Sequence, residues 1–109
     1  DEISVGFTRP TEKTVFLKVE IQGIKELWKD EFKKTIKDIY LKYIDEVDPN
    51  STIYLYKIIG EIYKNVSGIK TLKIKLGDVK YNEREQDYKL SNKEVAVANA
   101  DDITIEVNL

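Results

Sequence analysis

A strand pattern followed at once by a helix pattern most narrows the folds open to this chain. Along residues 14–21 every second residue is aliphatic, namely Val15, Leu17, Val19 and Ile21. Because successive side chains of a strand point to opposite faces of the sheet, these four share one face. From residue 24 onward apolar residues recur at helical spacing instead. A layered scaffold of helices on a sheet is therefore expected.

The sequence predicts two helices directly after this strand. The first covers about residues 25–47 and ends at Asp48, Pro49 and Asn50, because Pro49 cannot continue the hydrogen-bond ladder. Its apolar stripe is Trp28, Phe32, Ile36, Ile39, Tyr40, Tyr43 and Val47. The second covers about residues 55–66 with the stripe Leu55, Ile58, Ile59, Ile62, Tyr63 and Val66. Gly60 is expected to permit close packing of this helix, and Gly68 to supply a left-handed residue after it.

Two later alternating segments complete the predicted sheet. Their inward residues are Leu72, Ile74 and Leu76 in the first and Ile103, Ile105 and Val107 in the second, with a further short strand at residues 94–97. We expect an α+β, two-layer sandwich: two helices packed on one face of a three- to four-stranded mixed or antiparallel sheet, in β-α-α-β-β order. The opposite face carries charged residues, namely Lys18, Glu20, Lys73, Lys75 and Glu106.

The length of 109 residues fits one domain. Residues 1–12 are interpreted as a linker with an entry strand, because Ile3, Val5 and Phe7 alternate with small residues before Pro10 interrupts the pattern. Residues 13–109 form the single α+β domain, with a charged loop at about residues 77–93.

Composition argues against catalysis. The chain has no His and no Cys, so the usual side chains for proton transfer near neutral pH and for thiolate or zinc chemistry are missing. The acidic clusters at residues 45–48 and 101–102 lack the ligand spacing of an EF-hand. We therefore expect no catalytic, cofactor-binding or metal-binding residues, no small-molecule substrate and no enzyme activity. No apolar run reaches the roughly 20 residues that span a bilayer, so no membrane partner is expected.

Binding of nucleic acid is the less favoured alternative. Small α+β sandwiches often bind RNA on an open sheet face that carries two or three stacking aromatic rings. Here only Phe16 points outward from the first long strand, and the neighbouring strand offers Thr71, Lys73 and Lys75. The net charge of −2 adds no general attraction to phosphate.

Several segments together resemble the C-terminal domain of the baseplate J-like family. They are Phe7-Thr8-Arg9-Pro10-Thr11-Glu12, the strand at residues 15–21, both predicted helices, Ser67-Gly68-Ile69, and the closing stretch from Asn92-Lys93-Glu94-Val95-Ala96-Val97-Ala98 to Val107. The likeness covers nearly the whole chain in order and spacing, and it follows a hydrophobic pattern without a catalytic fingerprint. The charged segment at residues 81–88 departs from the short link that the family often has before its final strands.

The resemblance implies a structural component of a phage or prophage-like contractile tail baseplate, or of a related injection system. Its partners would be other baseplate or tail proteins, with self-association in the assembled tail, and it would need no cofactor. It would lie in the bacterial cytoplasm during assembly and then in the baseplate of the virion or tail-like particle. The candidate interaction surface comprises Ile3, Val5, Phe7, Tyr81, Arg84 and Tyr88. A generic α+β interaction or regulatory module is the alternative.

Overall fold

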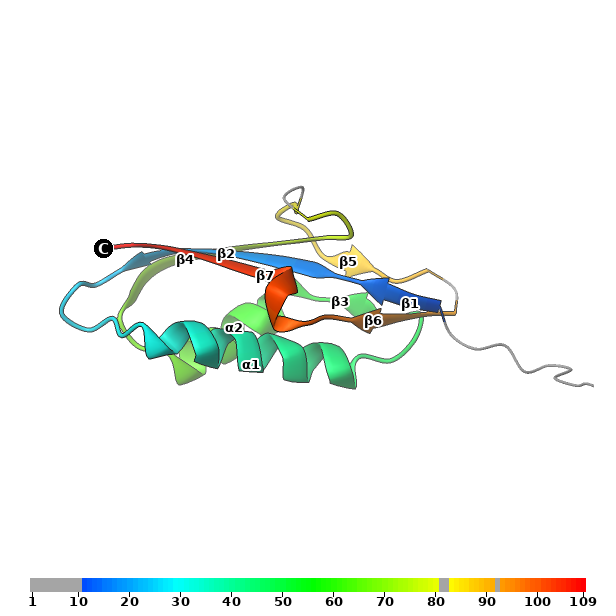
Figure 1. Cartoon of the computed structure of the whole chain (residues 1–109), viewed down its shortest axis with the longest axis horizontal. Coiled ribbons are helices and arrows are strands. Elements are labelled where there is room, and N and C mark those ends of the chain that lie inside the picture. The colour runs from blue at the N-terminus through cyan, green and yellow to red at the C-terminus, as the bar shows by residue number, and fades with distance from the viewer. Residues whose placement is uncertain (1–10, 81–82, 92) are drawn as a thin grey trace, which may run out of the picture.

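A computed structural model describes residues 11–80, 83–91 and 93–109 of the chain. The elements in chain order are β1 (Thr11–Thr14), β2 (Phe16–Gly23), α1 (Glu31–Glu46), β3 (Thr52–Ile53), α2 (Leu55–Asn65), β4 (Ile69–Gly77), β5 (Tyr88–Lys89), β6 (Glu94–Val97), the 3-10 turn η2 (Ala100–Asp102) and β7 (Ile103–Asn108). Both helices lie on one side of the long strands (Figure 1). The expected two-layer α+β sandwich is therefore confirmed.

The sheet is mixed and is built along one long central path. β2 pairs with β4 in the antiparallel sense and with β7 in the parallel sense, giving the order β4-β2-β7. β1 continues in line with β2 and pairs in parallel with β6 (Figure 1). The Val15 N–H donates to the Val97 carbonyl at 3.1 Å, so pairing continues between the two strands.

The chain between β6 and β7 makes a detour away from β1 and β2. Thr14 pairs with Val97 and Leu17 with Ile103, so three steps on one side correspond to six on the other. The extra residues include η2, where the Asn99 N–H donates to Asp102 Oδ2 at 2.8 Å in a capping box. The detour is thus a hydrogen-bonded turn, and it keeps β6 and β7 beside the same long path.

The core lies between the sheet and the helices. Val15, Leu17, Val19 and Ile21 are all buried, which confirms the alternation read from the sequence. The helices contribute Ile36, Tyr40 and Ile44 from α1 and Ile58 and Ile62 from α2. No polar or charged residue falls in the buried class within the described ranges. Burial of each large aliphatic side chain contributes about 1.5 to 3 kcal/mol, so apolar packing dominates the stability.

Tyr40 of α1 is fully buried and brings a polar hydroxyl group into the core. Its hydroxyl donates to the Val15 carbonyl at 2.7 Å. Burial, followed by the negative charge of Asp102, raises the pKa of Tyr40 above its ordinary value. The hydroxyl therefore stays protonated and joins α1 to the point where β1 meets β2.

The first helix begins later than predicted, at Glu31 and not near residue 25. Residues 24–28 instead form a separate turn, in which the Trp28 N–H donates to the Ile24 carbonyl at 2.8 Å. The Ile24 N–H donates to the Gly68 carbonyl at 2.7 Å, so this turn is held by the loop before β4. Tertiary contact has overridden the helical period, which continued smoothly through these residues.

Gly68 has the predicted left-handed conformation, with φ of 78°. It lies two positions after Val66, the C-cap residue of α2, so contacts with its neighbours explain this conformation better than capping of the helix does. A Cβ there would meet the Leu27 carbonyl carbon and the Trp28 nitrogen at 2.9 Å each. Glycine is therefore needed both for its φ and for the close approach of the turn at residues 24–28.

Two expectations for the second helix were wrong. A Cβ on Gly60 would meet no heavy atom within 4 Å, so this glycine faces open space and permits no close packing. Tyr63 was placed in the buried stripe, but its side chain is 49% exposed. The buried side of α2 is narrower than the sequence stripe and centres on Ile58 and Ile62.

The charged segment at residues 77–93 contains structure that its sequence did not predict. β5 pairs antiparallel with β3, which lies between the two helices and was absent from the expected element order. Ile53 of β3 and Leu90, just after β5, are both almost fully buried. The Leu90 N–H donates to the Ser51 carbonyl at 3.0 Å. These contacts fasten the second half of the segment to the turn after α1.

Candidate interaction surfaces

The predicted surface residues divide into two groups. Ile3, Val5, Phe7 and Tyr81 lie outside the described residues. Arg84 and Tyr88 both lie in the segment between β4 and β6.

The backbone of Arg84 extends the sheet by one position. Its N–H donates to the Leu76 carbonyl and its carbonyl accepts from the Leu76 N–H, each at 2.8 Å. Arg84 itself is exposed. A basic side chain is thereby fixed at one end of the open edge of β4.

Tyr88 is held more firmly than its place in a charged segment suggests. Its hydroxyl donates to Asp78 Oδ2 at 3.4 Å, and Asp78 also pairs with Lys13 of β1 at 3.4 Å. Burial, then the charges of Asp78 and Glu94, raise the pKa of Tyr88 to about 12. Tyr88 therefore works as a structural anchor of the segment, with about the exposure expected of a half-buried strand residue.

The outer face of the sheet carries a ladder of opposite charges. Glu20 Oε2 lies 3.1 Å from Lys75 Nζ and 3.7 Å from Lys18 Nζ, and Lys18 also reaches Glu106 at 3.7 Å. The hydrogen bond from Lys75 is the largest influence on Glu20, and it lowers the pKa of that carboxyl below its ordinary value. Because Lys18 and Lys75 have carboxylate partners, their charge on this face is compensated.

The edge of β4 that points away from β2 offers unpaired backbone groups. Leu76 turns its N–H and carbonyl toward Arg84, so the groups of Leu72 and Ile74 point the same way, by the alternation of a strand. Within the described residues no backbone partner meets these groups. The open stretch comprises residues 71–75 and is called the β4 strip below. It is bounded by Arg84 at one end and by the irregular register near Lys70 at the other.

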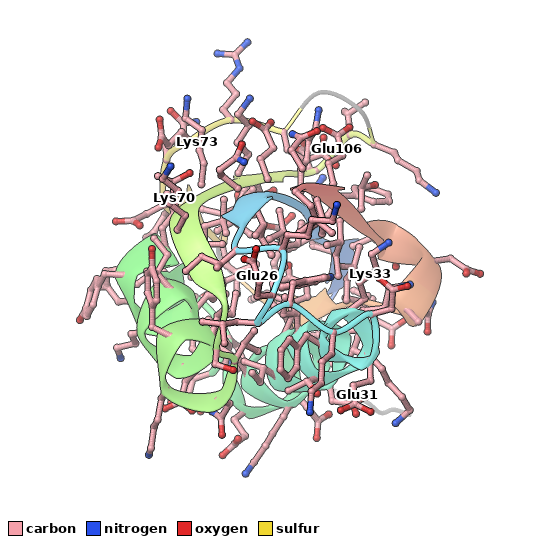
Figure 2. The ribbon with its side chains drawn as sticks, turned by 90° about the vertical axis from the view of Figure 1, so that its left-hand side faces the viewer. Glu26, Glu31, Lys33, Lys70, Lys73 and Glu106 are labelled. Carbon is pink, nitrogen blue, oxygen red and sulfur yellow. The ribbon has the colours of Figure 1, made fainter. Side chains whose placement is uncertain are left out.

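One side of α2, which includes Ile59 and Tyr63, lies near this strip. Glu61 and Asn65 line a groove shared with α1, so that side of α2 faces α1. At about 100° per residue, Ile59 and Tyr63 lie roughly 160° around the helix from Glu61. Since α2 lies beneath β4 in Figure 2, this flank runs below the open edge of the sheet.

The same flank includes Tyr56, the most exposed aromatic residue within the described ranges. Tyr56 is 66% exposed, and its ring lies 5.5 Å from the ring of Tyr54, over which Lys57 Nζ sits at 5.3 Å. We call Tyr56, Ile59 and Tyr63 the tyrosine flank. Sequence reasoning missed it because Tyr63 satisfies the helical period, although three tyrosines in one short helix and its N-cap were a visible signal.

Two hollows on the surface are open grooves. The first, about 500 Å³, lies between the helices and is lined by Thr35, Asp38, Ile39, Lys42, Tyr43, Glu46, Glu61 and Asn65. The second, about 410 Å³, lies where α1 meets β3. In the part of the chain that the structure covers, no group of three or more acidic, His or Cys residues is arranged to hold a metal ion. Neither does any helix among these residues have the length and apolar character needed to cross a membrane.

No family model matches the chain, and a search of curated proteins finds no match.

Proposed function

We propose that this chain is a structural domain of a contractile tail baseplate, from a phage, a prophage or a related injection system. It acts by docking to other baseplate or tail proteins and carries out no catalysis. It lies in the bacterial cytoplasm during assembly and in the baseplate of the particle afterwards. The identity of the assembly rests on the resemblance in segment order, from the Arg9-Pro10-Thr11 entry to the closing strand.

The observation that best supports docking is the β4 strip with the tyrosine flank beneath it. Open strand edges accept extended segments of other chains through main-chain hydrogen bonds. Tyrosine is enriched at interfaces, because its ring buries a large area while the hydroxyl remains hydrogen-bonded. A scaffold that exposes both features together is suited to assembly.

The proposal is tested with the parent protein expressed beside the products of adjacent genes. Purification through a tag on this domain is expected to recover other tail components as stoichiometric partners. Deletion of the parent gene is expected to abolish mature tails and to leave growth of the host unchanged. Tails that still assemble in the deletion strain would overturn the proposal.

The alternative is an interaction or regulatory module outside any tail. The tyrosine flank and the strip favour it equally, because neither feature depends on the kind of assembly. The same purification separates the two, since a signalling or metabolic protein recovered in equal amount would favour the alternative. Recovery of RNA would favour nucleic-acid binding, for which the paired Lys18 and Lys75 give little support.

A further inference from the structure

The β4 strip has the length and chemistry to accept one particular strand. We propose that residues 3–7 of one copy of the chain add to the β4 strip of a second copy, with their apolar side chains on its tyrosine flank. This inference goes beyond the proposed function and holds whether or not the assembly is a tail.

The donor and the strip match in length. Residues 3–7 and residues 71–75 are both five-residue stretches, each about 17 Å long as a strand. Leu72 and Ile74 offer two N–H groups and two carbonyls along this length, which is the pairing that a short added strand needs. Arg84 already occupies the next position, beside Leu76, so an added strand continues a row that the chain itself has begun.

The side-chain pattern matches as well. Ile3, Val5 and Phe7 alternate with Ser4 and Gly6, so a strand of these residues has one apolar face and one face of small residues. With the added strand shifted by one position relative to the ends of the strip, two of its apolar residues lie opposite Leu72 and Ile74. These two would continue the inward row of β4 over the tyrosine flank, and the third would lie just past the strip, opposite Lys70. The small residues would continue the outer face, where they create no exposed apolar patch.

Charge favours residues 3–7 as the added strand over the β4 edge of a second copy. Lysines on an edge discourage pairing between two copies of that edge, and β4 carries Lys70 and Lys73, both exposed. The donor is preceded by the acidic residues Asp1 and Glu2. The β4 edge has Lys70 at one end and Arg84 at the other, so this acidic pair lies near a basic residue whether the added strand is parallel or antiparallel to β4. The opposite edge of the sheet is β7, where Glu106 follows the acidic pair of η2, so it repels an acidic strand.

The chain cannot make this contact with itself. β1 is in line with β2, so Thr11 lies seven positions before Lys18, the residue opposite Lys75. The nearest end of the strip is therefore about 23 Å from Thr11 along the strand axis. Phe7 is four residues before Thr11 and reaches about 14 Å at most. A pairing of residues 3–7 with the β4 strip therefore takes place between two copies.

A donor and an acceptor at different places on the molecule give a head-to-tail contact, which closes into rings or continues as open chains. Sedimentation velocity of the full chain over a concentration series is expected to show successive oligomers. Val5→Asp removes the donor and Tyr63→Asp the acceptor flank, and each is expected to weaken association at least tenfold. Lys64→Asp, next to Tyr63 but on the solvent side of α2, is the matched control and is expected to change association less than twofold.

Mixing the two defective variants gives the sharpest test. Val5→Asp keeps its acceptor and Tyr63→Asp keeps its donor, so the mixture is expected to form one-to-one dimers and nothing larger. Tyr56→Asp replaces Tyr63→Asp if the latter shows a lowered melting temperature. Wild-type chain that stays monomeric at millimolar concentration, or Val5→Asp that associates like wild type, would overturn the proposal.

Hydrogen exchange identifies the edge. A peptide of residues 1–9, added to the Val5→Asp chain, is expected to protect the amides of Leu72 and Ile74 and to leave Lys73, already paired with β2, unchanged. A peptide in which Ser4 and Val5 are exchanged breaks the alternation and is expected to give no protection. Protection along β7, or none with either peptide, would show that the β4 strip is not the acceptor.

Discussion

Replacing Gly60 by alanine tests the placement of α2 on the surface. Gly60 lies in the interior of α2, where glycine costs about 0.8 to 1 kcal/mol relative to alanine. The added methyl group meets nothing within 4 Å, so no steric cost opposes this gain. Gly60→Ala is therefore expected to raise the free energy of unfolding by about 0.8 to 1 kcal/mol and the melting temperature by about 4 to 8 °C.

Urea unfolding measures this change directly. Trp28 is the only tryptophan of the chain, so its fluorescence and the far-ultraviolet circular dichroism report tertiary and helical structure separately. Coincident transitions justify a two-state treatment, and an unchanged m value shows that the mutation acts on stability alone.

Gly68→Ala is the matched contrast. Its φ of 78° disfavours a side chain, and its Cβ would approach the backbone of Leu27 and Trp28 to 2.9 Å. This variant is expected to lose at least about 1 kcal/mol. A destabilised or unchanged Gly60→Ala chain would refute the reasoning, because the backbone of α2 would then be covered at a place where the structure leaves it open.

Three further predictions concern the core and the outer face. Ile62→Ala is expected to cost about 2 to 5 kcal/mol in urea unfolding, and Ile59→Ala clearly less, because Ile62 is fully buried and Ile59 only partly so. Equal losses would contradict this orientation of α2. Tyr40→Phe is expected to cost about 1 to 3 kcal/mol by the same assay, because it removes the buried hydrogen bond to the Val15 carbonyl. Glu20 has a lowered folded pKa, so its contribution is fully present above its ordinary value near 4.5 and is lost as pH falls through the folded value. The difference in unfolding free energy between wild type and Glu20→Gln is therefore expected to shrink in acid, and a difference that grows there would contradict it.

The sequence predicted the layers because they follow from periodicity alone. Strand alternation identified the buried face of β2 correctly, including Val15 and Leu17. It did not reveal which strand lies beside which, since alternation specifies a face and not a neighbour. The parallel pairing of β7 with β2 depends on the path of the chain through η2, which has no local signature of that kind.

The errors arose where a distant contact decides the local structure. The turn at residues 24–28 follows a helical period but is held by Gly68, more than forty positions later in the chain. β3 and β5 are too short for any period, and only their pairing and the burial of Ile53 define them. The tyrosine flank could be recognised only from the position of α1, because periodicity alone assigns Tyr63 and Ile62 to the same apolar stripe. Of the candidate surface residues, Arg84 and Tyr88 were found in ordered contacts that the charge of their segment concealed.

The parallel arrangement of β2 and β7 has a mechanical consequence. The chain enters this pair at the β1 end and leaves it past Asn108, at the opposite end of the same ladder (Figure 1). A pull on the two ends along the strand axis therefore loads every hydrogen bond of the β2–β7 ladder in shear at once, and none can open before the others. The sheet therefore resists tension most strongly in this direction. Because β4 is antiparallel to β2, a pull on the end of β4 would instead separate the hydrogen bonds of the β2–β4 ladder one after another.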